Sequence, residues 1–438
     1  MTVESITQPE VRTEPCAARP ADAVKARPSV RRRLRRGIYH AAIRTMMFGY
    51  TLTLALARTL RRPPGRVAAG QKQTILLTGR FEADNWARAH LQPLAAAKNC
   101  ERLFVVSTYP VPEMPNVTPI YPSRWMIKWF GATQARLLVF CAWAIRHRPH
   151  VIGGFHLLVN GLASILLARA IRTRSMYFCV GGPVEALDGG IRGEPGPFAS
   201  METRDAYVEK CLLNALRNCQ LIITMGTRAK EFFRERDVMS ECHVVAGGID
   251  GARFSTPSSG RDIDIVFVGR LAEIKQVDIL LRAIAILRSQ RTIRAAIVGD
   301  GPLRGSLESL ASELGISADV RFTGRQADVA AWLRRSKVFV LTSRSEGLSL
   351  ALMEAMTCGV PAVVPDVGDL GDLVRHGCNG FLASDHRPET FAGYLEELLS
   401  DEDRLRSSSR AALESMKPYA PADVARRWDA ILAGEAES

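Results

Sequence analysis

From residue 71 onward the chain alternates short apolar runs with amphipathic stretches, and few folds accommodate such a pattern. Most of the apolar runs lack a polar residue at every second position, which is typical of strands covered on both faces of a parallel sheet. A polar segment at 256–260, Thr-Pro-Ser-Ser-Gly, interrupts the series. We therefore predict an α/β protein with two doubly wound parallel sheets and a ligand crevice where the carboxyl ends of the strands meet.

The pattern divides the chain into a tail (1–70), two Rossmann-like domains (71–257 and 258–415) and a final helix (416–438). The last amphipathic stretch, 422–432, is expected to pack back across the hinge. Strands are expected at 74–77, 103–107, 151–152, 176–180, 221–224, 242–245, 263–268, 295–298, 320–322, 338–341 and 362–364. Helices are expected at 161–170, 277–288, 303–314, 329–333 and 350–356.

Most of the net charge of +13 belongs to the tail. Residues 1–70 hold 14 Arg and Lys against 4 Asp and Glu, whereas the other 368 residues hold 44 against 41. The body is thus nearly neutral, which argues against a nucleic-acid partner. The nine cysteines are scattered without a Cys-x-x-Cys spacing, which favours reduced thiols in the cytoplasm over disulfides or a zinc site.

The tail carries an apolar segment between two groups of arginines. Residues 1–30 show no periodicity and are expected to be disordered. The segment 37–60 follows Arg-Arg-Arg-Leu-Arg-Arg, and its uncharged core, 45–57, is shorter than the roughly 20 residues that cross a bilayer. We predict a helix that lies in the membrane interface, drawn to anionic lipid by its arginines. A helix packed only on the protein and a true span are the alternatives.

Two glutamates eight positions apart bracket a turn after the apolar run at 338–341. Glu346 lies in the loop, and Glu354 lies about one turn into the predicted helix. Backbone N–H groups at the helix start, near Leu348 and Ser349, are free to bind an anion. Such a turn suits a ligand with hydroxyl groups at both ends and phosphate in the middle, such as a nucleotide sugar.

Two cations follow the first strand of the second domain. Gly269 permits a tight turn, after which Arg270 and Lys275 stand near the start of a helix. Their charges can neutralise a diphosphate leaving group, and two solvated surface cations are the alternative. Gly324 and Arg325 end a later strand, where the backbone can hold a nucleobase edge or simply form a turn.

Together these residues resemble retaining glycosyltransferases of family 4, also called group 1, which have the GT-B fold. The resemblance rests on Gly-Arg with a lysine five residues on, Gly-Asp-Gly-Pro at 299–302, the two glutamates with Ala-Met-x-Cys-Gly-x-Pro, and Asn-Gly-Phe at 379–381. It implies a nucleotide-sugar donor bound mainly by the second domain and an acceptor bound by the first. It also implies no metal and no cofactor other than the donor itself.

The resemblance assigns a role to each donor residue. Arg270 and Lys275 would contact the diphosphate, and together with Glu346 they are the predicted catalytic residues. Glu346 would also hold sugar hydroxyls, helped by the backbone at Gly347, Leu348 and Ser349, and Glu354 would hold the ribose hydroxyls. Gly79 matches the family's glycine loop, which approaches the donor phosphates.

The first domain departs from the family at one strand. Family members often carry a histidine where this chain has Val180, before a Gly-Gly pair. Glu185, just beyond this pair, is a candidate acceptor contact, and His156 at the end of another strand is either a second candidate or a structural histidine. In the second domain, Gln276 stands where glycine is usual.

Residues 121–130, Tyr-Pro-Ser-Arg-Trp-Met-Ile-Lys-Trp-Phe, combine aromatic and basic side chains. They suit a membrane interface or a lipid-linked acceptor, and a buried helix face is the alternative.

The expected protein is a metal-independent enzyme, peripheral on the inner face of the plasma membrane. It moves a hexose from a UDP- or GDP-sugar to a lipid-linked saccharide or polysaccharide, with retention of configuration. A nucleotide-sugar epimerase of similar fold would need no acceptor, and a non-catalytic membrane scaffold would bind nucleotide without turnover; both are alternatives.

Overall fold

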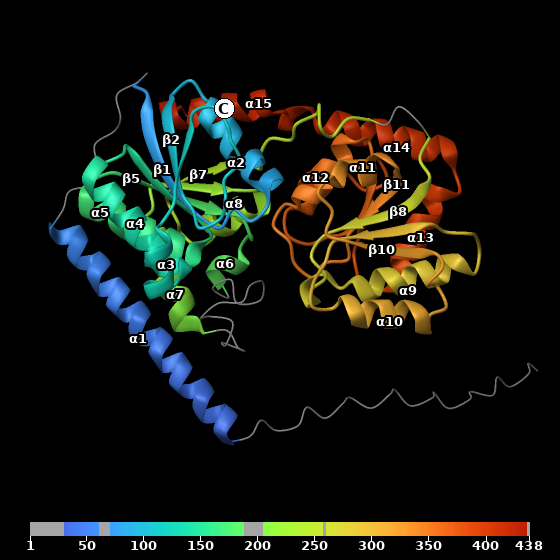
Figure 1. The fold of residues 1–438 in the computed structure, drawn as a ribbon, viewed down its shortest axis with the longest axis horizontal. Helices are drawn as coiled ribbons and strands as arrows, with labels where there is room; N and C mark the ends of the chain where they lie inside the picture. The colour runs from blue at the N-terminus through green and yellow to red at the C-terminus, as the bar shows by residue number, and fades with distance from the viewer. Residues whose placement is uncertain (1–29, 61–70, 188–204, 257–259, 436–438) are drawn as a thin grey trace, which may run out of the picture.

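Two α/β lobes form the body of the molecule, and a long helix lies along the outside of the first lobe (Figure 1). The computed structural model describes residues 30–60, 71–187, 205–256 and 260–435. The long helix is α1 (Val30–Leu60), and the disorder expected for the segment before it lies outside the described residues.

The first lobe contains a seven-stranded sheet with the order β3-β2-β1-β4-β5-β6-β7, in which all neighbouring strands are parallel. Its strands are β1 (Gln73–Thr78), β2 (Cys100–Val106), β3 (Val117–Ile120), β4 (Val151–Phe155), β5 (Arg174–Cys179), β6 (Leu221–Thr224) and β7 (Glu241–Val244). Its helical segments are α2 (Asp84–Ala96), α3 (Arg124–Phe130), α4 (Ala132–His147), η1 (Leu157–Gly161), α5 (Leu162–Ile171), α6 (Val184–Leu187), α7 (Ala206–Leu216) and α8 (Thr227–Arg234).

The second lobe contains a six-stranded parallel sheet with the order β10-β9-β8-β11-β12-β13. Its strands are β8 (Ile263–Val268), β9 (Ala295–Val298), β10 (Val320–Gly324), β11 (Ser336–Val340), β12 (Ala362–Pro365) and β13 (Gly380–Ala383). Its helical segments are η2 (Glu273–Lys275), α9 (Val277–Arg288), α10 (Arg304–Glu313), α11 (Val329–Arg334), α12 (Leu350–Thr357), η3 (Leu370–Asp372), α13 (Pro388–Leu399), α14 (Glu402–Ser415) and η4 (Lys417–Tyr419). The predicted pair of doubly wound sheets is confirmed.

The last helix, α15 (Pro421–Ala433), returns from the second lobe and covers the first (Figure 1). Trp428 is only 2% exposed in the first-lobe core, where its ring lies 5.8 Å from that of Phe178. The Gln73 side-chain amide donates to the Leu432 carbonyl at 2.6 Å. The two lobes are therefore connected twice, by the segment between β7 and β8 and by α15.

Strand β4 extends to Phe155, three residues beyond the predicted end. The extra length contains Gly153 and Gly154, which are poor strand formers and hid the strand from the sequence pattern. A Cβ atom on Gly153 would lie 2.5 Å from the Leu77 side chain, so close packing requires this glycine. The helix expected at 161–170 is preceded by the irregular turn η1, and the short strands β3 and β13 were not predicted.

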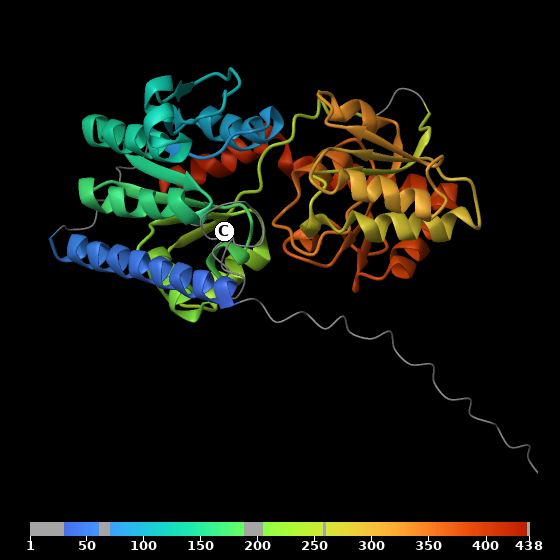
Figure 2. The same cartoon turned by 60° about the horizontal axis from the view of Figure 1, so that its bottom comes forward.

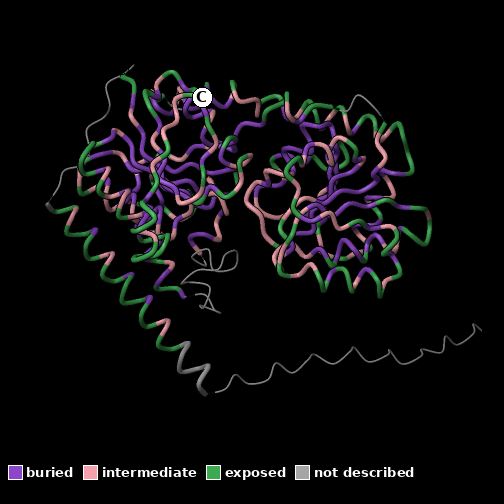
Figure 3. Tube along the Cα trace, viewed as in Figure 1, coloured by how far each residue is buried: buried purple, intermediate pink, exposed green. Residues whose placement is uncertain are grey.

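Helix α1 packs on the first lobe by one face. Ile43, Met47 and Leu54 are buried, and the Tyr50 hydroxyl donates to the Leu162 carbonyl at 3.1 Å. The opposite face stays exposed, as Figure 3 shows, while Figure 2 shows α1 lying beside α5. Within the described ranges, no helix combines the length and the apolarity that a membrane span requires.

Asp205 fastens α1 to the lobe. Its carboxylate accepts from Arg44 Nε at 2.8 Å and lies 3.2 Å from His40 Nδ1, and it also caps α7 by accepting from the backbone of Tyr207 and Val208. Burial alone would raise the pKa of Asp205, but the hydrogen bonds from Arg44 and His40 lower it.

Helix α3 has no buried residue, so the alternative of a buried helix face for 121–130 is wrong. Trp125 and Trp129 are 61% and 72% exposed.

Candidate active site

The second-lobe wall of the site is organised around an ion pair. Lys275 Nζ, at the end of η2, donates to Glu346 Oε1 at 2.5 Å, and the two side chains are 21% and 11% exposed. The Thr342 hydroxyl donates to the carbonyl of Lys275 at 3.0 Å, and the Arg344 amide donates to the carbonyl of Ile274 at 2.9 Å. These bonds align the loop after β11 with the turn after β8, which brings Lys275 and Glu346 together.

The turn that carries Lys275 requires an unusual backbone. Gln276, at the N-terminal boundary of α9, has φ 45° and ψ 46°, in the left-handed region. Glycine adopts this conformation without strain, which explains its frequent use at this position. Gln276 therefore places a long side chain in a turn whose backbone conformation suits glycine.

Further hydrogen-bond donors belong to the same wall as the ion pair. Arg270 is exposed, and its side chain has no hydrogen-bond or ion-pair partner among the described residues. Lys275 has three N–H bonds, of which Glu346 takes one. At the start of α12 the Ser349 hydroxyl accepts from the Leu352 amide at 3.4 Å. The backbone N–H groups of Leu348 and Ser349 find no acceptor within the part of the chain that the structure describes.

Glu354 lies deeper than the sequence suggests. It is only 2% exposed, and its Oε1 accepts a hydrogen bond of 2.6 Å from Asn85 Nδ2 on α2 of the first lobe. Burial raises the pKa of Glu354 to about 7, although the Asn85 bond and the charge of Arg253 oppose this rise. The carboxylate of Glu354, which was predicted to bind the ribose hydroxyls, therefore faces the first lobe rather than solvent.

Three glycines mark adjacent strand ends on the same wall. The Gly269 amide donates to the Val298 carbonyl, and the Gly299 amide donates to the Gly324 carbonyl, both at 3.0 Å. Arg325 follows and is exposed. The structure therefore groups Gly269, Gly324 and Arg325 at the carboxyl edge of the sheet that also carries Lys275 and Glu346.

The first-lobe wall is organised around Glu185, which the structure buries to 4% exposure. Its oxygens accept from the Tyr177 hydroxyl at 2.7 Å, from the Leu157 amide at 2.8 Å and from the Gly181 amide at 2.5 Å, and they lie 3.0 Å from His156 Nδ1. Burial would raise the pKa of Glu185, but the charge and hydrogen bonds around it lower the pKa instead. The carboxylate of Glu185 thus has four polar neighbours within its own lobe and little surface left for a ligand.

His156 is the accessible member of this group. It follows β4, has φ 64°, and keeps 37% of its side chain exposed. Glu185 fixes the orientation of its ring through Nδ1. Of the two candidate acceptor contacts, the structure therefore exposes only His156.

The two walls touch at their loops. A Cβ on Gly347 would lie 2.1 Å from the Val180 carbonyl oxygen, so only glycine fits this contact between the lobes. The Gly181 amide held by Glu185 is next to Val180, and the Gly347 loop is next to Glu346. The backbone segments next to Glu185 and Glu346 therefore lie in direct contact.

Arg136 is a further candidate for the site that the sequence did not reveal. Its guanidinium is buried, donates to the Gly79 carbonyl at 2.5 Å and to Asn160 Oδ1 at 2.8 Å, and has no carboxylate partner among the described residues. Burial lowers the pKa of Arg136 to about 10. Gly79 itself is buried, and its loop lies over this cation. A single arginine in an amphipathic helix carries no signal that could have predicted this contact.

The lobes are also joined at the N-terminus of α8. The amide of Thr227 donates to Asp372 at 2.6 Å and the amide of Ala229 donates to Asp369 at 3.2 Å. Arg228 adds an ion pair of 2.6 Å with Asp366. Side chains of the second lobe therefore cap a helix of the first lobe.

Two facing doubly wound α/β lobes with a helix that crosses back define the GT-B fold. Solved structures with this fold superpose on most of the chain. Sucrose-phosphate synthase from Thermosynechococcus elongatus matches 82% of this chain and 98% of its own, with a TM-score of 0.67 and 19% identity. Anabaena HepE in complex with UDP matches 83% and 100%, with a TM-score of 0.63 and 18% identity.

Residues 249–415 match the family model described as Glycosyl transferases group 1, so the second lobe is a domain of this type. D-inositol 3-phosphate glycosyltransferase from Jonesia denitrificans is 35% identical over 193 residues, which are 39% of this chain and 45% of the relative. N-acetyl-alpha-D-glucosaminyl L-malate synthase from Bacillus anthracis is 31% identical over 152 residues, which are 35% and 40%. The matched segment thus spans less than half the length of these curated relatives.

Proposed function

We propose that this protein is a glycosyltransferase that transfers a hexose from a UDP- or GDP-sugar to a hydroxyl acceptor, with retention of configuration and without a metal ion. The observation that most supports this proposal is the Lys275–Glu346 ion pair. The pair and Arg270 lie at the carboxyl edge of the sheet in a domain that matches the group 1 glycosyl transferases. The names of the relatives support a glycosyl transfer.

The proposed chemistry uses these groups at the donor. Arg270 and the two remaining N–H bonds of Lys275 bind the diphosphate and stabilise its growing charge as the sugar leaves. Glu346 holds sugar hydroxyls through the oxygen that Lys275 does not occupy, while the amides of Gly347, Leu348 and Ser349 stabilise negative charge. The buried guanidinium of Arg136, which holds the Gly79 loop, adds a positive field from the opposite wall.

Release of Asn85 would free the carboxylate of Glu354 for the ribose hydroxyls. Gly269, Gly324 and Arg325 lie where the nucleobase is expected. His156, oriented by Glu185, is the proposed contact for the acceptor on the first lobe.

The acceptor is proposed to be a lipid-linked saccharide or polysaccharide, reached from the inner face of the plasma membrane. Three apolar side chains of α1, Phe48, Leu52 and Leu56, are 57–60% exposed and recur at every fourth residue, so they form a stripe on one face. Trp125 and Trp129 of α3 are also exposed, and Arg124 and Lys128 accompany them. Such surfaces are typical of helices that lie on anionic membranes.

A donor screen tests the proposal. Purified protein is offered UDP- and GDP-hexoses with a saccharide acceptor, and the anomeric signal of the product is followed by NMR. We expect transfer with retention that is lost in Lys275→Ala and Glu346→Ala. Unchanged transfer rates in both variants would refute the proposed site, and interconversion of the donor sugar without an acceptor would favour an epimerase.

A further inference from the structure

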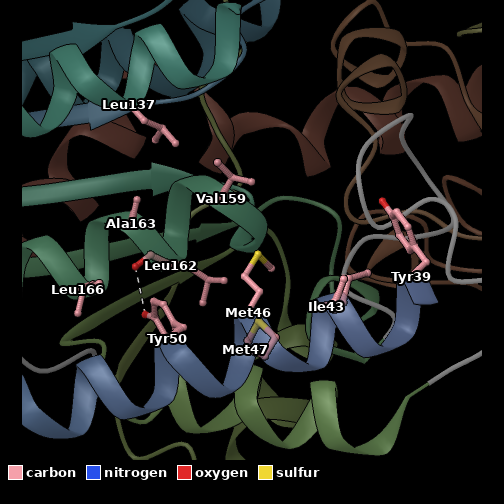
Figure 4. A pocket seen from close by; sticks show the side chains of 11 residues that line it. Tyr39, Ile43, Met46, Met47, Tyr50, Leu137, Val159, Leu162, Ala163 and Leu166 are labelled. Atoms are coloured by element: carbon pink, nitrogen blue, oxygen red, sulfur yellow. Dashed lines mark hydrogen bonds between the residues drawn. The ribbon is translucent and has the colours of Figure 1, made fainter. Parts of the chain in front are cut away.

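An apolar cavity of about 490 Å³ lies between α1 and the first lobe (Figure 4). Ile43, Met46 and Met47 of α1 belong to one wall, and Val159 of η1 and Ala163 of α5 belong to the other. No lining residue is charged, and the volume is within the range of small-molecule sites, about 300–1,000 Å³.

The cavity opens toward the exposed face of α1. At 100° per residue, the outward stripe of Phe48, Leu52 and Leu56 is separated from the cavity wall by Ala42 and Met46. Ala42 is exposed and Met46 is 51% exposed, and both line the cavity. An apolar surface therefore runs from the outside of α1 into the cavity.

Two residues that line the cavity lie close in sequence to residues of the first-lobe wall. Val159, which lines the cavity, comes three residues after His156. Leu137, also a lining residue, directly follows Arg136, whose guanidinium binds Gly79 and Asn160. The segments 156–159 and 136–137 therefore each contain one residue of the first-lobe wall and one residue that lines the cavity.

The backbone at Val159 is strained, which is a second sign of function. Val159 has φ 68° and ψ −60°, a conformation that β-branched residues rarely adopt. Strain of this kind persists mainly at sites where the surrounding structure uses it. Here it accompanies a valine that faces the cavity (Figure 4).

We propose that this cavity binds the hydrocarbon chain of the lipid-linked acceptor, an acyl or isoprenoid chain, while its head group reaches His156. The inference rests on the proposed function and makes α1 a wall of the acceptor site as well as a membrane contact. A peptide segment is a poorer occupant because its N–H and C=O groups need partners. The lining offers few, since the Tyr50 hydroxyl already donates to the Leu162 carbonyl.

The test measures binding of 11-(dansylamino)undecanoic acid to the full chain by fluorescence. Ala163→Trp fills the cavity from α5, and Ala42→Trp blocks it from the exposed edge, where a larger side chain does not disturb the core. We expect each variant to weaken probe binding at least tenfold, with unchanged partition onto anionic vesicles. The control Leu52→Ser should weaken vesicle binding and leave probe binding unchanged. Equal probe binding in wild type and a folded Ala42→Trp variant, or equal loss in Leu52→Ser, would overturn the proposal.

Two further measurements separate this inference from the proposed enzyme activity. Lys275→Ala should abolish thermal stabilisation by UDP or GDP while probe binding persists, so the donor site and the cavity can fail independently. Removal of residues 1–29 should leave probe affinity unchanged. A tenfold rise in affinity would mean that this segment of the chain occupies the cavity, and the lipid proposal would be wrong.

Discussion

The two walls of the cleft both contain carboxylates and cations, but they expose them differently. On the second-lobe wall, Arg270 is exposed and the Lys275–Glu346 pair is partly accessible. On the first-lobe wall, Glu185 and Arg136 are buried, and their bonds hold His156 and the Gly79 loop in place. The difference suggests that one wall binds charge directly, whereas the other uses charge to shape its backbone.

The largest expected effect is on the second-lobe wall. Lys275→Ala should lower kcat about 100- to 1,000-fold, because a preorganised cation at the leaving group is lost. Lys337→Ala is the matched control. Lys337 forms a similarly buried ion pair of 2.8 Å with Asp264, near the amino ends of the strands of the same sheet. Donor turnover assays of both variants check this, and similar losses in the two would mean that the loss of any buried ion pair lowers turnover and that Lys275 has no special part in it.

On the first-lobe wall, Glu185→Gln should act first on stability. The amide cannot accept from all the donors around Glu185, so we expect a loss of about 3 kcal/mol in the free energy of unfolding. Tyr177→Phe, which removes one of those donors, should cost about 1 kcal/mol. Urea unfolding at pH 7 measures both. A stable Glu185→Gln protein with lost acceptor affinity alone would instead make Glu185 a direct ligand.

Glu354 sharpens the comparison because it lies on the second lobe but is buried like Glu185. Its folded pKa of about 7 is above the unfolded value, so the unfolded chain releases the proton first as the pH rises. The free energy of unfolding should therefore fall between about pH 4.5 and 7, by roughly 3 kcal/mol in total. The free energy of unfolding of Glu354→Gln should not fall in this range. The difference in stability between this variant and wild type should therefore change in favour of the variant as the pH rises. A difference independent of pH would show that Glu354 is ionised in the folded protein.

The smallest expected effect concerns the contact between the lobes. Asp372→Ala removes a cap from α8 and should weaken the contact between the lobes by about 1 kcal/mol. An increase in the radius of gyration by small-angle X-ray scattering would report it. Asp319→Ala, which removes an ion pair within the second lobe, is the control and should leave the radius unchanged.

Local pattern predicted the two sheets because buried parallel strands read as continuous apolar runs. It failed at β4 since glycines interrupt the run, and at β3 and β13 because Pro119 interrupts the first and Gly380 begins the second. The spacing of Arg270, Lys275, Glu346 and Glu354 pointed to the second-lobe wall that is proposed to bind the donor, because these residues are close in sequence to strand ends. Arg136 and the organising role of Glu185 depend on contacts between distant segments, which no local pattern encodes.

The capping of α8 by the second lobe gives the protein a built-in probe of its own opening. The amide hydrogens of Thr227 and Ala229 are bonded to Asp372 and Asp369, so they are protected only while the lobes stay together. Hydrogen–deuterium exchange at these two positions should follow the equilibrium between closed and open molecules, whereas amides inside β6 should follow global unfolding. Slower exchange at α8 on addition of a nucleotide sugar would show that the donor favours the closed molecule, without any label or mutation.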